Sequence, residues 1–171
     1  MQGGGSTIVL DATLGADAAT IDVTAIVGSY KALQFILSGR STDAVLSSLV
    51  RMRINSDAGT NYDNERIFGN SGGVGQDGAA GEQAIRLGEI VGGNGAAGRV
   101  GQLIGYIHNY AGTSFHKVVT STGGYHADTT TGRLAQHSSG IWLSTAAITT
   151  LSFFPNANNF LAGTRLTVFG L

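Results

Sequence analysis

The sequence predicts an all-β protein, a sandwich or barrel built from about ten short strands. Three observations support this fold class. Short runs rich in Ile, Val, Leu and Phe recur roughly every 8–15 residues, as strands do in sandwiches and barrels. The chain has 27 glycines and one proline, and Ser, Thr, Asn and Asp fill the gaps between the apolar runs, which is the composition of turns. No window of helical length keeps a convincing helical period.

Each expected strand is an apolar run bounded by turn residues. The clearest one alternates: Val50, Met52 and Ile54 point to one face, while Arg51 and Arg53 point to the other. Such alternation is typical of a half-buried strand. The expected strands, in chain order, are 6–12, 19–26, 30–39, 49–55, 83–91, 102–110, 114–122, 133–144 (one bent strand or two), 147–154 and 164–171.

The segments between these strands are predicted to be turns and loops. Residues 55–66 carry turn chemistry throughout, and 69–82 and 92–101 are glycine-rich. The best helix candidate, 41–52, has a thin apolar set and predicts at most one helical turn. In the last strand we expect Leu166 and Val168 to face the core, and we assign Trp142 to the core as well.

Length and composition narrow the class of protein. A chain of 171 residues fits one domain, here 7–171, preceded by a flexible glycine leader at 1–6. Only 12% of residues are charged, against about 25% in an ordinary soluble domain. A surface so poor in charge favours stable assembly into a homo-oligomer or onto a larger body. The net charge of −1 offers no field for nucleic acid or an anionic membrane.

Two spacings imitate catalytic motifs. Gly93, Gly95 and Gly98 spell G-x-G-x-x-G, but a strand-like run follows them where a dinucleotide site needs a helix. Ser71 lies in a G-x-S-x-G spacing that also lacks the helix of a nucleophile elbow. We therefore expect no catalytic residue, no enzyme activity and no cofactor.

Ion binding stays open at this stage. The four histidines form no ligand pair of known spacing. The segment with Asp57, Asn61, Asp63 and Glu65 is dense enough in oxygen to bind calcium. Its spacing is not that of an EF-hand, and Asn and Asp are also common turn formers. A turn is the preferred interpretation.

One surface could hold a saccharide. Tyr106, His108 and Tyr110 are spaced as a row on one side of a strand. Sugars pack a C–H face on an aromatic ring and hydrogen-bond to nearby polar groups. The alternative is that these rings lie in the core or at a subunit interface. The polar part of the candidate contact surface is Asn61, Tyr62, Asp63 and Arg66.

The chain resembles a recurrent virion-surface domain of tailed bacteriophages, found in decoration proteins, head fibres and tail-associated binding proteins. The resemblance rests on "IDVTAIVGSYKALQFILSGRST", "RINSDAGTNYDNER", "NYAGTSFHKVVTSTGGY", "GIWLSTAAITTLSFFP" and "NNFLAGTRLTVFGL". It covers nearly everything from Ile21 to Leu171. It implies an antiparallel, jelly-roll-like β-sandwich, assembled as a homo-oligomer and usually as a trimer, that attaches to the virion and in some members binds receptors. It implies no catalytic residues, so none are assigned. The glycine-rich segment 69–81 departs from the pattern, so no loop function is transferred.

From these observations we expect a trimeric capsid decoration (cement) protein on the virion surface, bound to the major capsid protein or another virion protein. The sequence has a short leader and no shaft, which favours direct attachment to a shell. The leader residues Gln2, Gly3, Gly4 and Gly5, with Phe169 and Leu171, are the expected docking and oligomer contacts. The alternative is a tail-fibre or head-fibre module that binds a host surface glycan. An enzyme acting on such glycans is a third, less favoured hypothesis.

Overall fold

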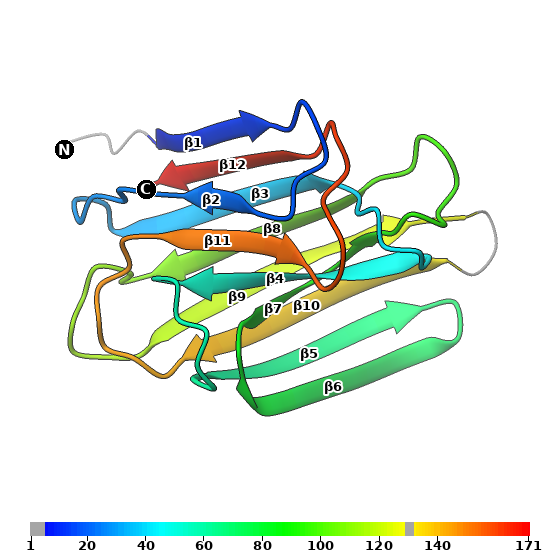
Figure 1. Ribbon diagram of the computed structural model, residues 1–171. Coiled ribbons are helices and arrows are strands. Elements are labelled where there is room, and N and C mark those ends of the chain that lie inside the picture. The colour runs from blue at the N-terminus through cyan, green and yellow to red at the C-terminus, as the bar shows by residue number, and fades with distance from the viewer. Residues whose placement is uncertain (1–5, 129–131) are drawn as a thin grey trace.

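The computed structural model describes residues 6–128 and 132–171, and within them the chain is all-β with antiparallel sheets and no helix (Figure 1). The predicted fold class is therefore confirmed at this level. The strands are β1 (Thr7–Thr13), β2 (Ile21–Val23), β3 (Ala32–Gly39), β4 (Ser47–Ile54), β5 (Tyr62–Asn70), β6 (Gly73–Glu82), β7 (Ile85–Val91), β8 (Gly101–His108), β9 (Lys117–His126), β10 (Arg133–Trp142), β11 (Leu151–Pro155) and β12 (Arg165–Gly170).

The strands form two layers in a sandwich-like arrangement (Figure 1). The larger sheet has eight strands in the order β1-β12-β3-β8-β9-β10-β5-β6, and the smaller has four in the order β2-β11-β4-β7. Across the sandwich, β7 packs mainly against β9 and β10 of the larger sheet. The β5–β6 hairpin, at the end of the larger sheet, consequently reaches past the edge of the smaller one.

The core lies between the two sheets. Strands β3 and β4 bury every second side chain, as their sequences predicted. Phe35 of the larger sheet meets Phe153 of the smaller one edge to face, with ring centroids 5.3 Å apart. Gly105 lies beneath the Phe35 ring, where an added Cβ would come within 2.1 Å of a ring carbon. Only glycine therefore lets β8 pass behind this ring.

The final strand lies inside its sheet, between β1 and β3. Leu166 and Val168 are fully buried, as predicted, and Phe169 points to the opposite face. Trp142 is also buried, as predicted. Residues 133–142 form one continuous strand, β10, which resolves the alternative of one strand or two.

All ten expected strands occur, but the predictions for residues 55–82 were wrong in two places. Strand β5 begins inside the segment assigned to turns, and β6 occupies most of the segment assigned to a glycine loop. Both strands lack the apolar alternation that marks a strand, because neither packs a full face on the core. The glycines of β6 make room for side chains of β5: a Cβ at Gly75 would lie 2.6 Å from the Phe68 ring. Residues 41–52 contain no helical turn, in agreement with the predicted limit of at most one, and bends there lead directly into β4.

The glycine loop 92–100, between β7 and β8, was predicted correctly, and the structure explains its composition. The Arg40 guanidinium donates to the backbone carbonyls of Gly92, Gly93, Gly95 and Ala96 at 2.9–3.2 Å. The loop folds around one half-buried cation, which requires a backbone that can turn its carbonyls toward it. The described part of the chain contains no helix with the length and apolar character needed to cross a membrane.

The Phe35–Phe153 contact should govern stability. We expect Phe153→Ala to lower the free energy of unfolding by about 3–5 kcal/mol, because it removes a fully buried ring and leaves a cavity between the sheets. Chemical denaturation followed by Trp142 fluorescence measures this. Phe115→Ala, at a phenylalanine that is 71% exposed, is the matched control and should change stability little. Equal losses in the two variants would contradict this account of the core.

Candidate functional site

The polar segment that follows β4 serves the fold. Asn55 has a left-handed backbone (φ 51°) and uses its whole amide: its Nδ2 donates to Ala147 O at 2.8 Å, and its Oδ1 accepts from the N–H groups of Thr149 and Thr150. Asn55 thereby fixes the loop between β10 and β11. This is the structural role that Asn plays in turns.

Asp57 is the centre of the same segment. Its carboxylate accepts from Trp142 Nε1 at 2.8 Å, Asn61 Nδ2 at 2.9 Å and the Gly59 N–H at 2.8 Å. These hydrogen bonds lower the pKa of Asp57, and the bond from Trp142 has the largest effect. With its oxygens occupied by protein donors, Asp57 acts as the anchor of a turn. This matches the preferred interpretation of the segment.

Tyr62 is placed in the interior. Its side chain is fully buried, and its hydroxyl accepts from the Ile54 N–H at 3.2 Å and donates to Asp57 O at 3.0 Å. Burial raises the pKa of Tyr62 to about 12. Tyr62 therefore does not belong to an exposed contact surface, contrary to its place in the predicted set. The two residues beside Tyr62 in that predicted set lie nearer the surface. Asn61 is exposed, and the half-buried Asp63 accepts a hydrogen bond from the Gly81 N–H.

Arg66 is the hub of an ion-pair network that ties the β5–β6 hairpin to the rest of the fold. It contacts Asp77 of β6 and, at 2.6 Å, Glu89 of β7. Burial opposes the charge on Arg66, but its bonds to Asp77 and Glu89 prevail and raise its pKa. The same network includes Arg86 and Arg51, both paired with Glu82. Three arginines thus pair with three carboxylates, those of Asp77, Glu82 and Glu89. The Arg66 side chain is therefore used within the protein and is not a ligand contact.

The predicted aromatic row is split by the structure. Tyr106 and His108 lie on the outward side of β8, nearly parallel, with centroids 6.2 Å apart. Gln34 of β3 donates to the Tyr106 hydroxyl at 2.6 Å. Tyr110 is fully buried, and its hydroxyl donates to Val27 O and accepts from the Tyr30 N–H. The left-handed residue Asn109 (φ 51°) breaks the strand between them, so the period of two no longer applies.

Tyr106 and His108 belong to a broad surface that we call the outer face: the side of the eight-stranded sheet turned away from the smaller sheet. In its four central strands, β3, β8, β9 and β10, all of them described, Arg133 is the only outward-pointing Lys, Arg, Asp or Glu. One row of neighbours across the sheet is Ile36, Ile104, Thr122, His137 and Ile67. Phe169 lies on this face through its pairing with Gln34.

The outer face is uneven. A hollow of about 390 Å³ lies over β9, β10, β5 and β6 and is lined by Ile67, Val74 and His137 among others. A second, of about 630 Å³, lies beside Asp63, Val118 and Ile141. Val74 is 91% exposed and Ile67 56% exposed. Unpaired apolar side chains therefore surround surface depressions, which is a common feature of interaction surfaces.

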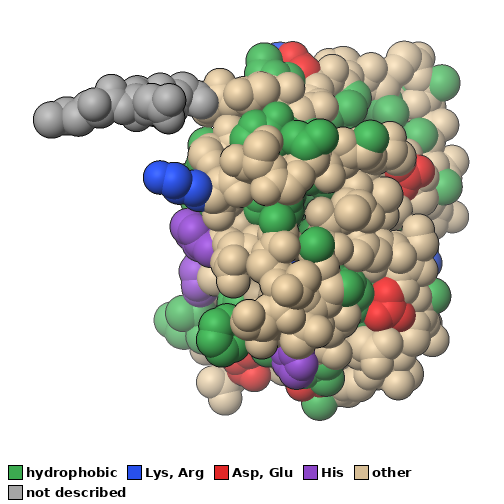
Figure 2. All heavy atoms as spheres, turned by 90° about the vertical axis from the view of Figure 1, so that its left-hand side faces the viewer, with side chains coloured by type: hydrophobic (Ala, Val, Ile, Leu, Met, Phe, Trp, Pro, Cys, Tyr) green, Lys and Arg blue, Asp and Glu red, His purple; other side chains and the backbone are tan. Residues whose placement is uncertain are grey.

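The loops at one end of the sandwich are also poor in charge. Figure 2 looks onto the end where β2–β3, β4–β5, β8–β9 and β10–β11 are connected, and few acidic or basic side chains appear among polar and hydrophobic ones. Val27, Phe115 and Leu143 are exposed in these loops. Behind them Lys117 is almost fully buried, and its Nζ donates to Phe115 O and Thr145 O. Burial lowers the pKa of Lys117.

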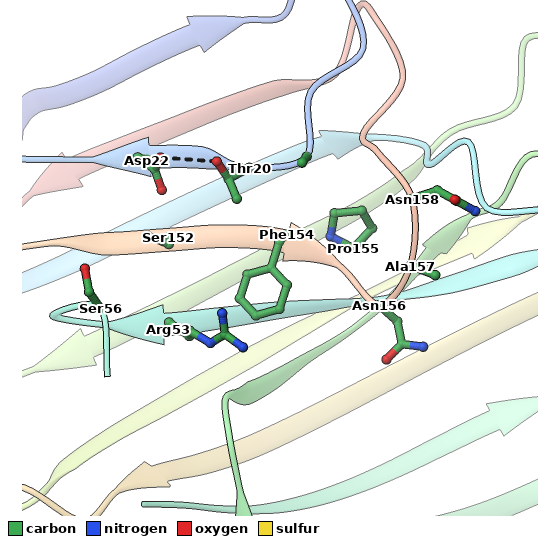
Figure 3. Close-up of a pocket in the computed structure, with 11 residues that line it drawn as sticks. Thr20, Asp22, Arg53, Ser56, Ser152, Phe154, Pro155, Asn156, Ala157 and Asn158 are labelled. Atoms are coloured by element: carbon green, nitrogen blue, oxygen red, sulfur yellow. Dashed lines mark hydrogen bonds between the residues drawn. The ribbon is translucent and has the colours of Figure 1, made fainter. Parts of the chain in front are cut away.

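The four-stranded sheet has a different outward surface. A groove of about 520 Å³ runs over β2, β11 and β4, with Phe154 and Arg53 on one side and Thr20 and Asp22 on the other (Figure 3). The Arg53 guanidinium lies 4.8 Å from the Phe154 ring centroid. Asn156 and Asn158 form one end of the groove. None of the predicted contact residues lies here.

The motif-like spacings have ordinary structural roles. Ser71 lies in the turn of the β5–β6 hairpin and is followed by a strand, and Gly93, Gly95 and Gly98 lie in the loop around Arg40. Within residues 6–128 and 132–171 no three His, Cys, Asp or Glu side chains group as a metal site would. Of the predicted docking residues, Leu171 is 39% exposed, whereas Gln2, Gly3, Gly4 and Gly5 lie outside the described residues.

Comparison with known proteins adds no relationship: no family model, no curated protein and no solved structure matches this chain.

Alkaline pH tests the placement of Tyr62. Because its folded pKa of about 12 lies above the ordinary value of 10.0, the folded state holds the phenol proton longer than the unfolded state does. Stability should therefore fall as pH rises from about 10 to about 12, by up to about 2–3 kcal/mol. Tyr62→Phe should be less stable at neutral pH by about 1–3 kcal/mol, because Asp57 O and the Ile54 N–H lose their partner. Urea denaturation should show this gap narrowing above pH 10; a constant gap would refute the assignment.

The Arg66 network should hold the hairpin in place. We expect Arg66→Met to destabilise the protein by about 3–5 kcal/mol, because Glu89 and Asp77 lose a largely buried partner. In the Arg66→Met variant, hydrogen exchange relative to the wild type should accelerate more for the amides of β5 and β6 than for those of β3. Arg165→Met, which removes the exposed ion pair with Asp11, is the matched control and should leave the unfolding midpoint almost unchanged. Unaltered exchange in β5 and β6 would argue against the network's role.

Proposed function

We propose that this protein is a structural component of a bacteriophage virion, a homotrimeric decoration (cement) protein that binds the outer shell through the major capsid protein or another virion protein. The single observation that carries the proposal is the nearly uncharged outer face of the eight-stranded sheet. The resemblance of the sequence to virion-surface domains supplies the biological setting. The proposed role is passive, without a catalytic step.

The outer face has the composition of an interface. Depletion of charge with enrichment of aromatic side chains distinguishes the centre of protein interfaces from the remaining surface. Here Ile36, Ile104 and Tyr106 lie among Gln, Thr and Ser side chains, and the formal charges lie mainly at the margins, as in the Asp11–Arg165 pair. Burial of this face in an oligomer would desolvate few charges.

The mechanism of capsid stabilisation is multivalency. Three joined copies present three identical contact surfaces, so weak individual contacts to neighbouring shell subunits add to tight binding. Because only the assembled shell offers all three sites together, binding stabilises the assembled state by mass action.

We also propose that the sandwich has jelly-roll connectivity. Strands β1, β12, β3 and β8 are neighbours in one sheet, and β2, β11, β4 and β7 are neighbours in the other. A jelly roll has eight strands in two sheets. Here the chain crosses between the sheets at every connection except β5–β6, β8–β9 and β9–β10. The hairpins β5–β6 and β9–β10 would then be additions that widen one sheet.

The oligomer can be tested at the middle of the outer face. We expect light scattering to give three chains per particle for the wild type and one for Thr122→Glu, because the variant buries a carboxylate at the centre of the interface. Thr60→Glu, at an exposed loop threonine, is the matched control and should remain trimeric. A monomeric wild type, or a trimeric Thr122→Glu variant, would overturn this interface.

Particle stability tests the biological role. We expect phage heads that carry the protein to release DNA at a higher temperature than heads that lack it. Adding the Thr122→Glu variant to heads that lack the protein should raise their release temperature only slightly. The measurement is dye-detected DNA release during heating. Equal release temperatures with and without the protein would exclude a cement role.

A further inference from the structure

The groove on the four-stranded sheet has the chemistry of a saccharide site. We propose that it binds an oligosaccharide, with one sugar ring against Phe154 and its hydroxyls bonded to the surrounding polar side chains (Figure 3). A volume of about 520 Å³ falls within the usual range of small-molecule clefts, about 300–1,000 Å³. This inference is independent of the virion assignment, because it uses residues that the outer face does not contain.

Phe154 and Arg53 form one pre-organised wall. Arg53 is held by the Phe154 ring at 4.8 Å and by a bond from its Nε to Gln83 O at 3.2 Å. Its two terminal nitrogens donate to no other described residue, so they remain available in a fixed position. A planar guanidinium of this kind can donate two parallel hydrogen bonds to adjacent sugar hydroxyls or to a carboxylate. The exposed part of the ring supplies an apolar platform.

The other walls supply hydroxyl and amide groups. Asp22 and Arg53 flank Ser152 across three adjacent strands, and Thr20 donates to Asp22 at 3.2 Å. The end wall is held in place: the Asn156 N–H donates to Leu49 O at 2.7 Å, and Asn158 donates to Asp43. The side chain of Asn156 bonds to no described residue. Hydrogen-bond donors and hydrogen-bond acceptors therefore both line the groove, which suits a ligand rich in hydroxyl groups.

The same lining disfavours other ligand classes. One carboxylate and one guanidinium balance each other, so the groove offers no net positive charge for a nucleic-acid backbone. The many polar groups would be left unpaired by a lipid chain, at a cost for each. A saccharide satisfies the polar groups and the single ring together.

Binding can be tested by NMR titration of the intact protein. The probes are lactose, N,N′-diacetylchitobiose, maltotriose and a digalacturonate, which cover neutral, N-acetylated and acidic sugars. We expect at least one to shift the backbone amides of residues 20–22, 152–154 and 156–158 and to leave those of β8 and β9 unchanged. Failure of all four probes to shift these amides would overturn the proposal, as would shifts confined to the outer face.

Variants identify the groups that bind. Phe154→Ala should weaken binding by at least about tenfold, the scale of a lost ring contact, whereas Phe115→Ala, its matched control on an exposed loop, should not. Because Phe154→Ala could also disturb β11, Asn156→Ala and Arg53→Lys give independent tests at more exposed atoms. Each should reduce the shifts at least severalfold, and Arg53→Lys most for the acidic probe. Unchanged titrations in both would refute the assigned site even if a sugar binds. The oligomer proposal is tested separately, by light scattering of Thr122→Glu, so its failure would not affect the test of the groove.

Discussion

The face-to-face packing of the two sheets is the constraint on which the remaining structure depends. Phe35 and Phe153 meet at its centre, and Gly105 gives the Phe35 ring its space. Because side chains alternate along a strand, burying one face of each sheet also decides what the other face displays. The outer face and the groove are both consequences of this one choice of register.

Several of the protein's few charged side chains join neighbouring elements of the fold. Arg66, Asp77 and Glu89 join the overhanging hairpin to β7, and Arg40 gathers a glycine loop around itself. Buried ion pairs and charge-assisted bonds of this kind hold elements that have little apolar surface of their own. The central outer face is almost without charge, which is the property on which the proposed assembly rests.

The two sheets consequently present two different surfaces. The larger one is broad, nearly neutral and dotted with exposed Ile and Val side chains, features that suit contact with other protein subunits. The smaller one is polar and grooved around Phe154 and Arg53, features that suit a small hydroxylated ligand. Because they lie on opposite sides of the sandwich, occupation of one surface would leave the other accessible.

The sequence by itself determined the all-β class, ten of the strands and the inward direction of residues such as Leu166 and Val168, since the period of two is a local property of the chain. It did not reveal β5 and β6. Their strand state depends on pairing, of β5 with β10 and of β6 with β5, and on the Arg66 network rather than on an apolar pattern. Tyr62 and Tyr110 were named as candidate contact residues, with the core left open for the aromatic row. Their burial could not be predicted, because it is set by distant partners such as Val27, 83 positions away from Tyr110. The groove could not be predicted from the sequence for the same reason. Strands β2, β4 and β11 are distant in the chain, and only their pairing in the sheet places Asp22, Ser152 and Arg53 side by side.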